Sequence, residues 1–439
     1  MAKEKNAAKS AIARQTEKLA AEMARINKAL FDKPELCYQE TFAAGLLREK
    51  LAEEGFSVRA PLAGLPTAFA ATRKGTGGKG PTVALIAEYD ALPQLGHACG
   101  HSLIAATAFG AAAAIARATP DHPGTLMVIG TPAEEGGGGK VKMVEEGVFK
   151  GVDAAIMVHP SNKTRVVARM FAVTEQTFTF TGKAAHAAAF PYKGVNALDA
   201  GVLFYNAVST MRQQLKEEAR VHGIFTHGGD APNIIPEKVE MAFYIRALDR
   251  DYFREVIAKV RQCAQGAAKA AGCKVKIKQR GLVYEPFYPS YPMGRAFRDN
   301  MTMIKAREDG YSETEEIGSS DIGNLSQVVP SLHPEYAIGG VEDINHSRNF
   351  LAAVMSKKGA AAAMAMTKAM AMTVYDLLAD PQLMAETKRA FKGAKGARVA
   401  KGARVVKGAS VVKGARVVKG ASVVKGARVV KGASARGAK

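Results

Sequence analysis

The sequence predicts an α/β fold: a mostly parallel sheet with helices on both faces, into which a ferredoxin-like α+β domain is inserted. Two patterns predict it. Over residues 81–160, short apolar runs alternate with helical stretches, which is typical of a parallel sheet with both faces covered. Over residues 171–280 the order becomes strand, helix, strand, strand, helix, strand, which is the order of a ferredoxin-like sandwich.

The individual elements follow from hydrophobic periodicity. An amphipathic helix is expected over residues 11–31. The parallel sheet should take its strands from residues 83–87, 125–130 and 154–158, with a packed Ala-rich helix over 102–118. The inserted domain should hold strands 174–181, 222–227, 238–247 and 274–278 and helices 195–219 and 252–271. The α/β pattern then resumes and ends in a long Ala- and Met-rich helix over 351–378.

The length of 439 residues suggests more than one domain. We expect a main domain in two parts, residues 1–170 and 283–391, an inserted domain at 171–282, and a basic tail at 392–439. The tail repeats K-G-A-[RS]-V-V, with Gly in every unit. Because Gly disfavours a helix and repeated charge opposes collapse, we expect disorder there.

The net charge of +20 comes mostly from this tail, which holds 14 Lys and Arg and no Asp or Glu and so leaves +6 for residues 1–391. Two interpretations of the tail stay open: an arm that binds nucleic acid or another polyanion, and a dispensable low-complexity extension.

Cellular location is inferred from what the chain lacks. The nearest candidate for a membrane span, residues 103–116, is short, Ala-rich and ended by Arg117, so we expect it to be a packed helix and no segment to span a bilayer. The N-terminus has no secretory signal. The cysteines, Cys37, Cys99, Cys263 and Cys273, show no paired spacing. We therefore expect a cytoplasmic protein with no disulfides and no membrane partner.

Potential metal ligands follow each of three predicted strands. The carboxyl ends of parallel strands meet at one edge of a sheet, and zinc accepts thiolate, imidazole and carboxylate ligands. The sequence therefore predicts a metal site at that edge. The side chains, in chain order, are Glu88, Asp90, His97, Cys99 and His101 in E-Y-D-A-L-P-Q-L-G-H-A-C-G-H, then Glu134 and Glu135 in T-P-A-E-E-G-G-G-G, then His159.

The Glu134–Glu135 pair suggests a division of labour. The two side chains project differently, so one can bind a cation while the other takes a proton from the bound water and hands it to a leaving amine. The four glycines that follow, Gly136 to Gly139, are expected to let the backbone approach a substrate closely.

The segments G-H-A-C-G-H, G-T-P-A-E-E-G-G-G-G and M-V-H-P resemble the binuclear metallopeptidases related to aminoacylase and carboxypeptidase G, the peptidase M-twenty family. The nearest branch is the amidohydrolase subfamily of aminobenzoyl-glutamate hydrolase, indoleacetyl-amino-acid hydrolases and β-alanyl-lysine-type dipeptidases. The resemblance covers most of residues 10–385. It implies a metal-dependent exopeptidase-like catalytic domain, an inserted lid and dimerisation domain, a homodimer, and two divalent metal ions, Zn or Mn. The implied reaction is hydrolysis of the amide bond of N-acyl amino acids or dipeptides.

The resemblance also implies residue roles. Glu134 would be the general base, and His186 in G-K-A-A-H-A-A would polarise the scissile carbonyl, at the partner subunit's site in dimeric relatives. For the last histidine ligand His346 competes with His333; we prefer His346, which lies in a loop beyond the strand-like residues 336–338. Asn233 and Arg246 would contact the substrate, Arg246 at its carboxylate. The implied metal ligands are Cys99, His101, Glu135, His159 and His346.

One residue departs from the family pattern. Many relatives carry Asp or Asn after C-G-H, where this chain has Ser102, so we expect the groups that orient His101 to differ.

Two other functions stay open. Cys99 could be the nucleophile of a cysteine-dependent amidohydrolase, with His97 or His101 as its base. Alternatively, the chain could be a polyanion-binding protein that acts through its basic tail.

Overall fold

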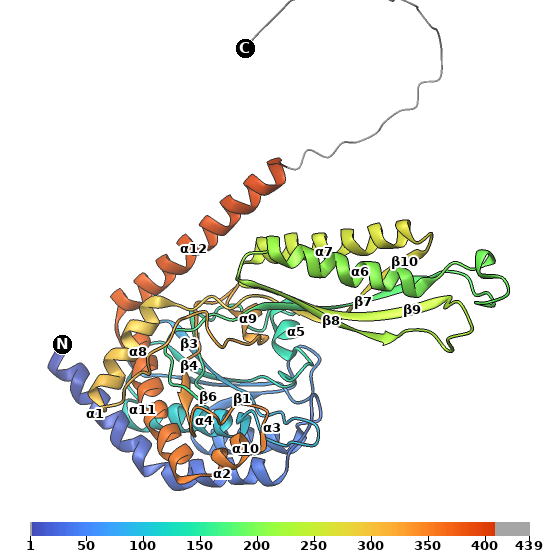
Figure 1. Cartoon of the computed structure of the whole chain (residues 1–439). Helices are drawn as coiled ribbons and strands as arrows, with labels where there is room; N and C mark the ends of the chain where they lie inside the picture. The colour runs from blue at the N-terminus through green and yellow to red at the C-terminus, as the bar shows by residue number, and fades with distance from the viewer. Residues whose placement is uncertain (1, 409–439) are drawn as a thin grey trace, which may run out of the picture. The chain divides into compact units, whose positions relative to one another are not determined.

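The computed structural model describes residues 2–408, of which those up to residue 397 belong to one compact unit (Figure 1). Its main sheet has six strands in the order β1-β2-β4-β3-β5-β11. Strands β4, β3, β5 and β11 run parallel, as predicted, whereas β2 and β1 add an antiparallel edge that the sequence did not reveal. The strands are β1 (Ser57–Arg59), β2 (Phe69–Lys74), β3 (Thr82–Ala87), β4 (Thr125–Gly130), β5 (Ala154–Ile156) and β11 (Ser331–Leu332).

Strand β3 explains why helices cover both faces of this sheet. All of its residues after Thr82 are buried, and successive side chains of a strand point to opposite faces. Val83 and Leu85 join one core cluster, while Ala84 and Ile86 join another. The first cluster includes α1 (Ala2–Lys18), α2 (Ala20–Asp32), α3 (Thr41–Glu53), α4 (His101–Ala118), α8 (Tyr291–Met303), α10 (Arg348–Val354) and α11 (Lys357–Ala379); the second includes α5 (Gly139–Glu145) and α9 (Ile322–Leu325).

Helix α4 is the central helix of this core. It is the one described helix that is long and apolar enough to cross a membrane by length and composition, and 89% of it is buried inside the protein. The prediction of a packed helix over this Ala-rich stretch is therefore confirmed.

Two predicted helices are each divided in the structure. The helix expected over residues 11–31 is α1 followed by α2, which separate near Leu19. The buried Thr16 hydroxyl donates to the Ile12 carbonyl, a bond that tends to bend a helix. The helix expected over residues 351–378 is α10 followed by α11, because Ser356 caps the start of α11 by accepting from the Gly359 N–H.

The inserted domain has the predicted ferredoxin-like topology. Its antiparallel sheet has the order β10-β7-β9-β8, and α6 and α7 pack on one face of it (Figure 1). Strands β7 and β10, which join the domain to the rest of the chain, lie side by side. The elements are β7 (Ala172–Thr181), α6 (Ala197–Met211), β8 (Ala219–His227), β9 (Lys238–Ala247), α7 (Arg250–Ala270) and β10 (Lys274–Tyr284), with short 3-10 turns at Pro191–Lys193 and Arg212–Gln214.

The start of the basic tail differs from the expectation of disorder. Helix α12 (Pro381–Gly408) continues past residue 392 and includes the first repeat unit. Ala, Lys and Arg are strong helix formers, and they offset the glycines over this stretch. The remaining repeats, residues 409–439, lie outside the described residues.

Candidate metal centre

The loop between β3 and α4 brings Cys99 and His101 to the edge of the sheet. Gly100 between them has φ +83°, a conformation that favours glycine. A Cβ at Gly100 would lie 2.8 Å from Cγ of Pro160. Only glycine therefore allows this loop to pack against the residue that follows His159.

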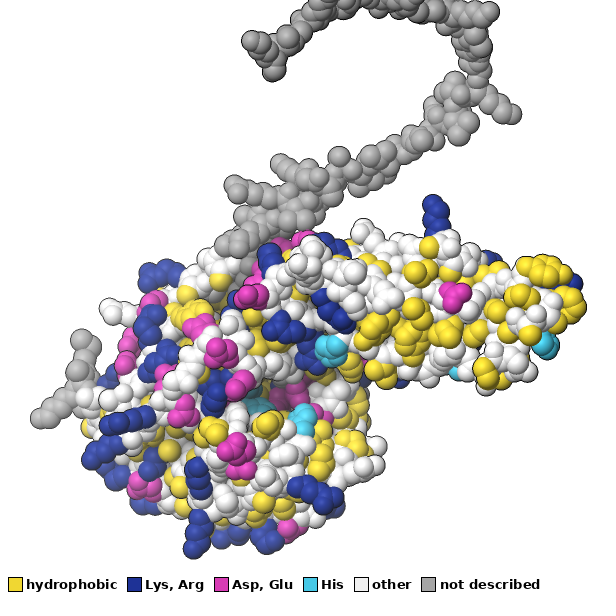
Figure 2. Space-filling view, viewed as in Figure 1, with side chains coloured by type: hydrophobic (Ala, Val, Ile, Leu, Met, Phe, Trp, Pro, Cys, Tyr) yellow, Lys and Arg dark blue, Asp and Glu magenta, His cyan; other side chains and the backbone are white. Residues whose placement is uncertain are grey.

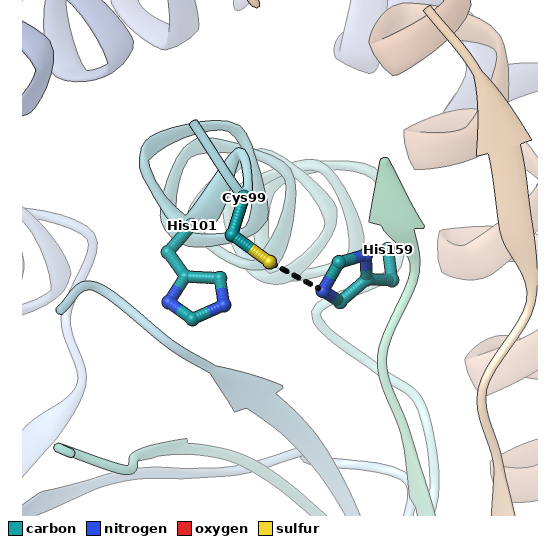
Figure 3. A group of neighbouring side chains, drawn as sticks. All are labelled: Cys99, His101 and His159. Carbon is teal, nitrogen blue, oxygen red and sulfur yellow. Dashed lines mark hydrogen bonds between the residues drawn. The ribbon is translucent and has the colours of Figure 1, made fainter. Parts of the chain in front are cut away.

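The predicted ligands come together around one space. Cys99 Sγ lies 3.7 Å from His159 Nε2, and Figure 3 shows the thiol directed at that ring with His101 beside it. His159 stands at the start of β6 (His159–Ser161), which pairs with β12 (Glu335–Ala337). His346 Nε2 lies 3.3 Å from Glu135 Oε1. Three groups have ligand atoms within 4.8 Å of one another: Cys99, His101 and His159; Cys99, Glu135 and His346; His101, Glu134 and Glu135.

Asp90, which follows β3, orients His101. The imidazole Nδ1 lies 2.9 Å from Asp90 Oδ1 and 3.0 Å from the Asp90 carbonyl oxygen. Nδ1 therefore carries the proton, and Nε2 is free to bind a cation. Although burial opposes it, His101 lowers the pKa of the Asp90 carboxyl to about 2. The buried Ser102 hydroxyl has no hydrogen-bond partner, so Asp90 and not Ser102 orients the His101 ring.

The donor set fits divalent cations. His101 Nε2 and Glu135 Oε1 are buried and have no hydrogen-bond partner, which normally carries a free-energy cost. Burial, with Glu88 and Glu135 nearby, raises the pKa of Glu134 well above its usual range. Burial also raises the pKa of the Cys99 thiol. A cation would offset each of these costs, and thiolate, imidazole and carboxylate together suit zinc-like metals.

The two candidates for the last histidine have different surroundings. His333 is buried with its ring centroid 5.2 Å from that of His159, and neither of its nitrogens has a hydrogen-bond partner. His346, with φ +68°, extends from the loop before α10 and joins the Cys99–Glu135 group. The geometry thus places His346 rather than His333 among the clustered ligand atoms.

The candidate substrate residues lie in two places. His186 and Asn233 are both exposed, and the Ala187 N–H donates to the Asn233 carbonyl. Neither side chain lines the cavity that contains the clustered ligands of its own chain. Arg246 on β9 does not line the cavity either, but its guanidinium donates at 2.9 Å to the hydroxyl of Ser319, which does line it.

The cavity has a volume of about 640 Å³. Its acidic and histidine side chains gather in a hollow that Figure 2 shows below the inserted domain. Tyr284, the last residue of β10, lines it and donates from its hydroxyl to the Glu134 carbonyl at 2.9 Å. The inserted domain is therefore bonded directly to the backbone of the predicted base.

The glycines after Glu135 do not all serve the expected purpose. Gly136 lines the cavity and has open space beside it, as expected for close approach to a substrate. A Cβ at Gly137, Gly138 or Gly139 would instead meet other parts of the chain, at Gly139 only 1.9 Å from the Pro132 carbonyl oxygen. These three allow α5 to pack tightly beneath the site.

Two residues near the site were missed. Lys140 is completely buried, and its ammonium lies 2.5 Å from Glu88 Oε1 and 2.7 Å from Asp321 Oδ1. A lysine in the first turn of a short helix is usually exposed, and Asp321 is far away in the sequence. No local signal pointed to either.

The chain is similar in sequence to known peptidases and amide hydrolases. The family model for peptidase family M20/M25/M40 matches residues 84–372. An Xaa-Arg dipeptidase from Mus musculus is 37% identical over 381 residues, covering 83% of this chain and 88% of that protein. One of the subunits of the p-aminobenzoyl-glutamate hydrolase of Escherichia coli is 36% identical over 261 residues, 54% of this chain and 53% of that one.

The fold is also found among solved structures. A dinuclear metal-binding peptidase of the M20 family from Bacillus subtilis superposes with a TM-score of 0.66 at 20% identity, over 82% of this chain and 99% of that one. An aminobenzoyl-glutamate utilization protein from Klebsiella pneumoniae gives a TM-score of 0.61 at 17% identity, over 84% of this chain and 98% of that one.

Proposed function

We propose a substrate and a set of residue roles from the premise that this chain belongs to peptidase family M20/M25/M40 and is a metal-dependent hydrolase of amide bonds. The substrates are dipeptides or N-acyl amino acids, cut at the amide bond next to a free carboxylate. One observation carries the proposal: among the described residues, three overlapping groups have potential ligand atoms within 4.8 Å of one another, and all of their members except the fully buried His101 line one cavity.

In this proposal two divalent cations, Zn or Mn, are held by Cys99, His101, Glu135, His159 and His346. When bound, they supply Lewis acidity, which acidifies a water molecule and polarises the scissile carbonyl.

The protein's own groups handle the proton and the substrate. Glu134, whose pKa burial raises, takes a proton from the attacking water and returns it to the leaving amine. Arg246, which is hydrogen-bonded to Ser319 of the cavity wall, binds the substrate carboxylate. Asn233 contacts the substrate, and His186 donates to the carbonyl oxygen as negative charge develops there.

His186 and Asn233 are proposed to act in the cavity of a second copy of the chain. Both are exposed and lie outside their own chain's cavity. The inserted domain also exposes large apolar side chains on α6 and on the edge strand β8, a surface suited to a homodimer. They are Val202, Leu203, Tyr205, Ile224 and Phe225.

Mixed dimers test this arrangement. His186→Ala and Glu134→Gln should each be inactive alone. After subunit exchange, half of the dimers are mixed and each has one intact site, so about a quarter of wild-type activity should return if the dimer is symmetric. Mixtures that stay inactive although exchange is demonstrated would refute the shared site.

We also propose a substrate preference and a cellular location for the protein. The relative named Xaa-Arg dipeptidase favours dipeptides that end in a basic residue. The four cysteines are free thiols, and Cys99 must stay reduced to bind metal, which favours the cytoplasm.

The proposed function is tested by metal analysis of the purified protein together with a hydrolysis screen over dipeptides and N-acyl amino acids. Two metals per chain and hydrolysis of one of these classes are expected. Hydrolysis that survives complete metal removal would instead favour Cys99 as a nucleophile. Truncation after Phe391 tests the polyanion hypothesis. If the truncated protein still hydrolyses substrate but has lost salt-sensitive nucleic-acid binding, that binding belongs to the tail alone.

A further inference from the structure

Glu88 is an acidic residue at the metal centre to which the proposed mechanism gives no role. It follows β3 directly and is completely buried. Its Oε1 is held by the Lys140 ammonium at 2.5 Å. Its Oε2 has no hydrogen-bond partner and lies 3.4 Å from His101 Nε2, which is also buried and without a partner. Two unsatisfied ligand atoms thus face each other in the interior.

The separation of these atoms is that of two ligands on one ion. Metal bonds are about 2.1 Å long to nitrogen and oxygen and about 2.3 Å long to sulfur. With tetrahedral angles, nitrogen and oxygen ligands of one zinc-like ion therefore lie about 3.4 Å apart, and nitrogen and sulfur ligands about 3.6 Å apart. Two pairs of proposed ligands follow this rule, at 3.3 Å for His346 Nε2 and Glu135 Oε1 and 3.7 Å for Cys99 Sγ and His159 Nε2.

Glu88 follows the same rule, whereas Glu134 does not. Glu134 Oε2 lies 4.0 Å from His101 Nε2, which is longer than the ligand separation and fits a base beside the ion. Of the two carboxylates with an oxygen within 4.0 Å of His101 Nε2, Glu88, which has no assigned role, therefore has the ligand spacing.

The charge around Glu88 points the same way. Lys140 contacts both Glu88 and Asp321, and all three side chains are buried. Asp321 also accepts the Lys140 backbone N–H at 2.8 Å, which fixes the ammonium between the two carboxylates. One ammonium cannot neutralise two carboxylates, and a buried surplus charge is costly. A cation at His101 would remove that surplus.

We propose that Glu88 is a further ligand of the cation held by His101, and that Lys140, anchored by Asp321, is the positioning residue that holds the Glu88 carboxylate in ligand geometry. This inference rests on the proposed function, since it presupposes a cation at His101. It adds a carboxylate to the five predicted ligands and explains why a lysine is buried beneath the site.

Metal binding tests the proposal independently of activity. Wild type, Glu88→Gln and Glu134→Gln are compared by metal content after dialysis, by dissociation constants for zinc measured in chelator competition, and by the visible spectrum of the cobalt-loaded protein. Each Gln variant neutralises one carboxylate that faces His101 Nε2, so the two are matched. Glu134→Gln should keep two metals. Glu88→Gln should weaken one of them by at least about 100-fold, since losing a mere supporting group already costs about 10–100-fold, and should change the cobalt spectrum.

Two controls check that the Glu88 variant folds and that the wild-type protein binds metal. If Glu88→Gln alone leaves Lys140 too poorly paired to fold, the double variant Glu88→Gln/Lys140→Met removes one charge of each sign, and its metal-free melting curve checks the fold. A folded Glu88 variant that binds two metals with wild-type affinity and spectrum overturns the proposal. A wild type that binds no metal overturns the proposed function as well.

Discussion

Replacing Glu134 by Gln should separate catalysis from metal binding. The structure gives the reason: Glu134 Oε2 lies 4.0 Å from His101 Nε2, too far for a shared tetrahedral ion, whereas Glu135 Oε1 lies 3.3 Å from His346 Nε2. The change keeps the shape of the side chain and replaces the carboxylate by a neutral amide that cannot accept the proton. General acid–base catalysis contributes about 10²–10⁴-fold, equivalent to about 2.7–5.5 kcal/mol of barrier at 1.36 kcal/mol per tenfold.

The assay combines initial rates over a range of substrate concentration with metal analysis of the same samples. The kcat should fall by about 10²–10⁴-fold, with KM and metal content little changed. Glu135→Gln, one residue away, should lose metal, and the exposed Glu146→Gln on the same segment should change neither. A Glu134→Gln enzyme with a kcat within tenfold of wild type, or one that has lost a metal, would refute the assignment of Glu134 as the base.

Three further predictions follow from the same site. Removing metal with a chelator should abolish activity and zinc or manganese should restore it, measured by initial rates; full activity in metal-free enzyme would contradict the ligand set around Cys99. Arg246→Ala should raise KM by about 10–100-fold for substrates with a free carboxylate, the value of a charged hydrogen bond, and should leave KM unchanged for the corresponding amides; equal effects on both substrates would show that Arg246 does not bind the carboxylate. Gly139→Ala should lower the midpoint of thermal unfolding, because its Cβ would lie 1.9 Å from the Pro132 carbonyl oxygen and overpacking costs about 1–3 kcal/mol, whereas Gly266→Ala, in open space on α7, should not lower it.

The fold was predictable where the sequence pattern is local. The strands before Glu88, Glu134 and His159 are short apolar runs, and the parallel topology dictates that their carboxyl ends meet. The edge strands β1 and β2 were missed because their burial is incomplete. In addition, β1 pairs only with β2, and β2 joins the main sheet through β4, which lies some fifty residues further along the chain. The breaks near Leu19 and at Ser356 are each accompanied by a single hydroxyl hydrogen bond, from Thr16 and at Ser356, which hydrophobic periodicity does not detect.

The site was predictable to the extent that residue type dictates chemistry. Cysteine, histidine and carboxylate side chains at strand ends can be predicted as candidate ligands from residue type alone. The roles within the set depend on distances, and the sequence could not separate Asp90, which orients His101, from Glu88, which faces its free nitrogen. The burial of Lys140 could not be predicted from the sequence, because it depends on Asp321, about 180 residues further along the chain.

The hydrogen bond from Tyr284 to the Glu134 carbonyl couples the position of the inserted domain to the backbone of the candidate metal centre. Tyr284 ends a strand that begins at Lys274, so a tilt of that strand must either move the Glu134 backbone or break the bond. If Glu134 is the base, as proposed, substitutions in the inserted domain that shift β10 should also lower turnover.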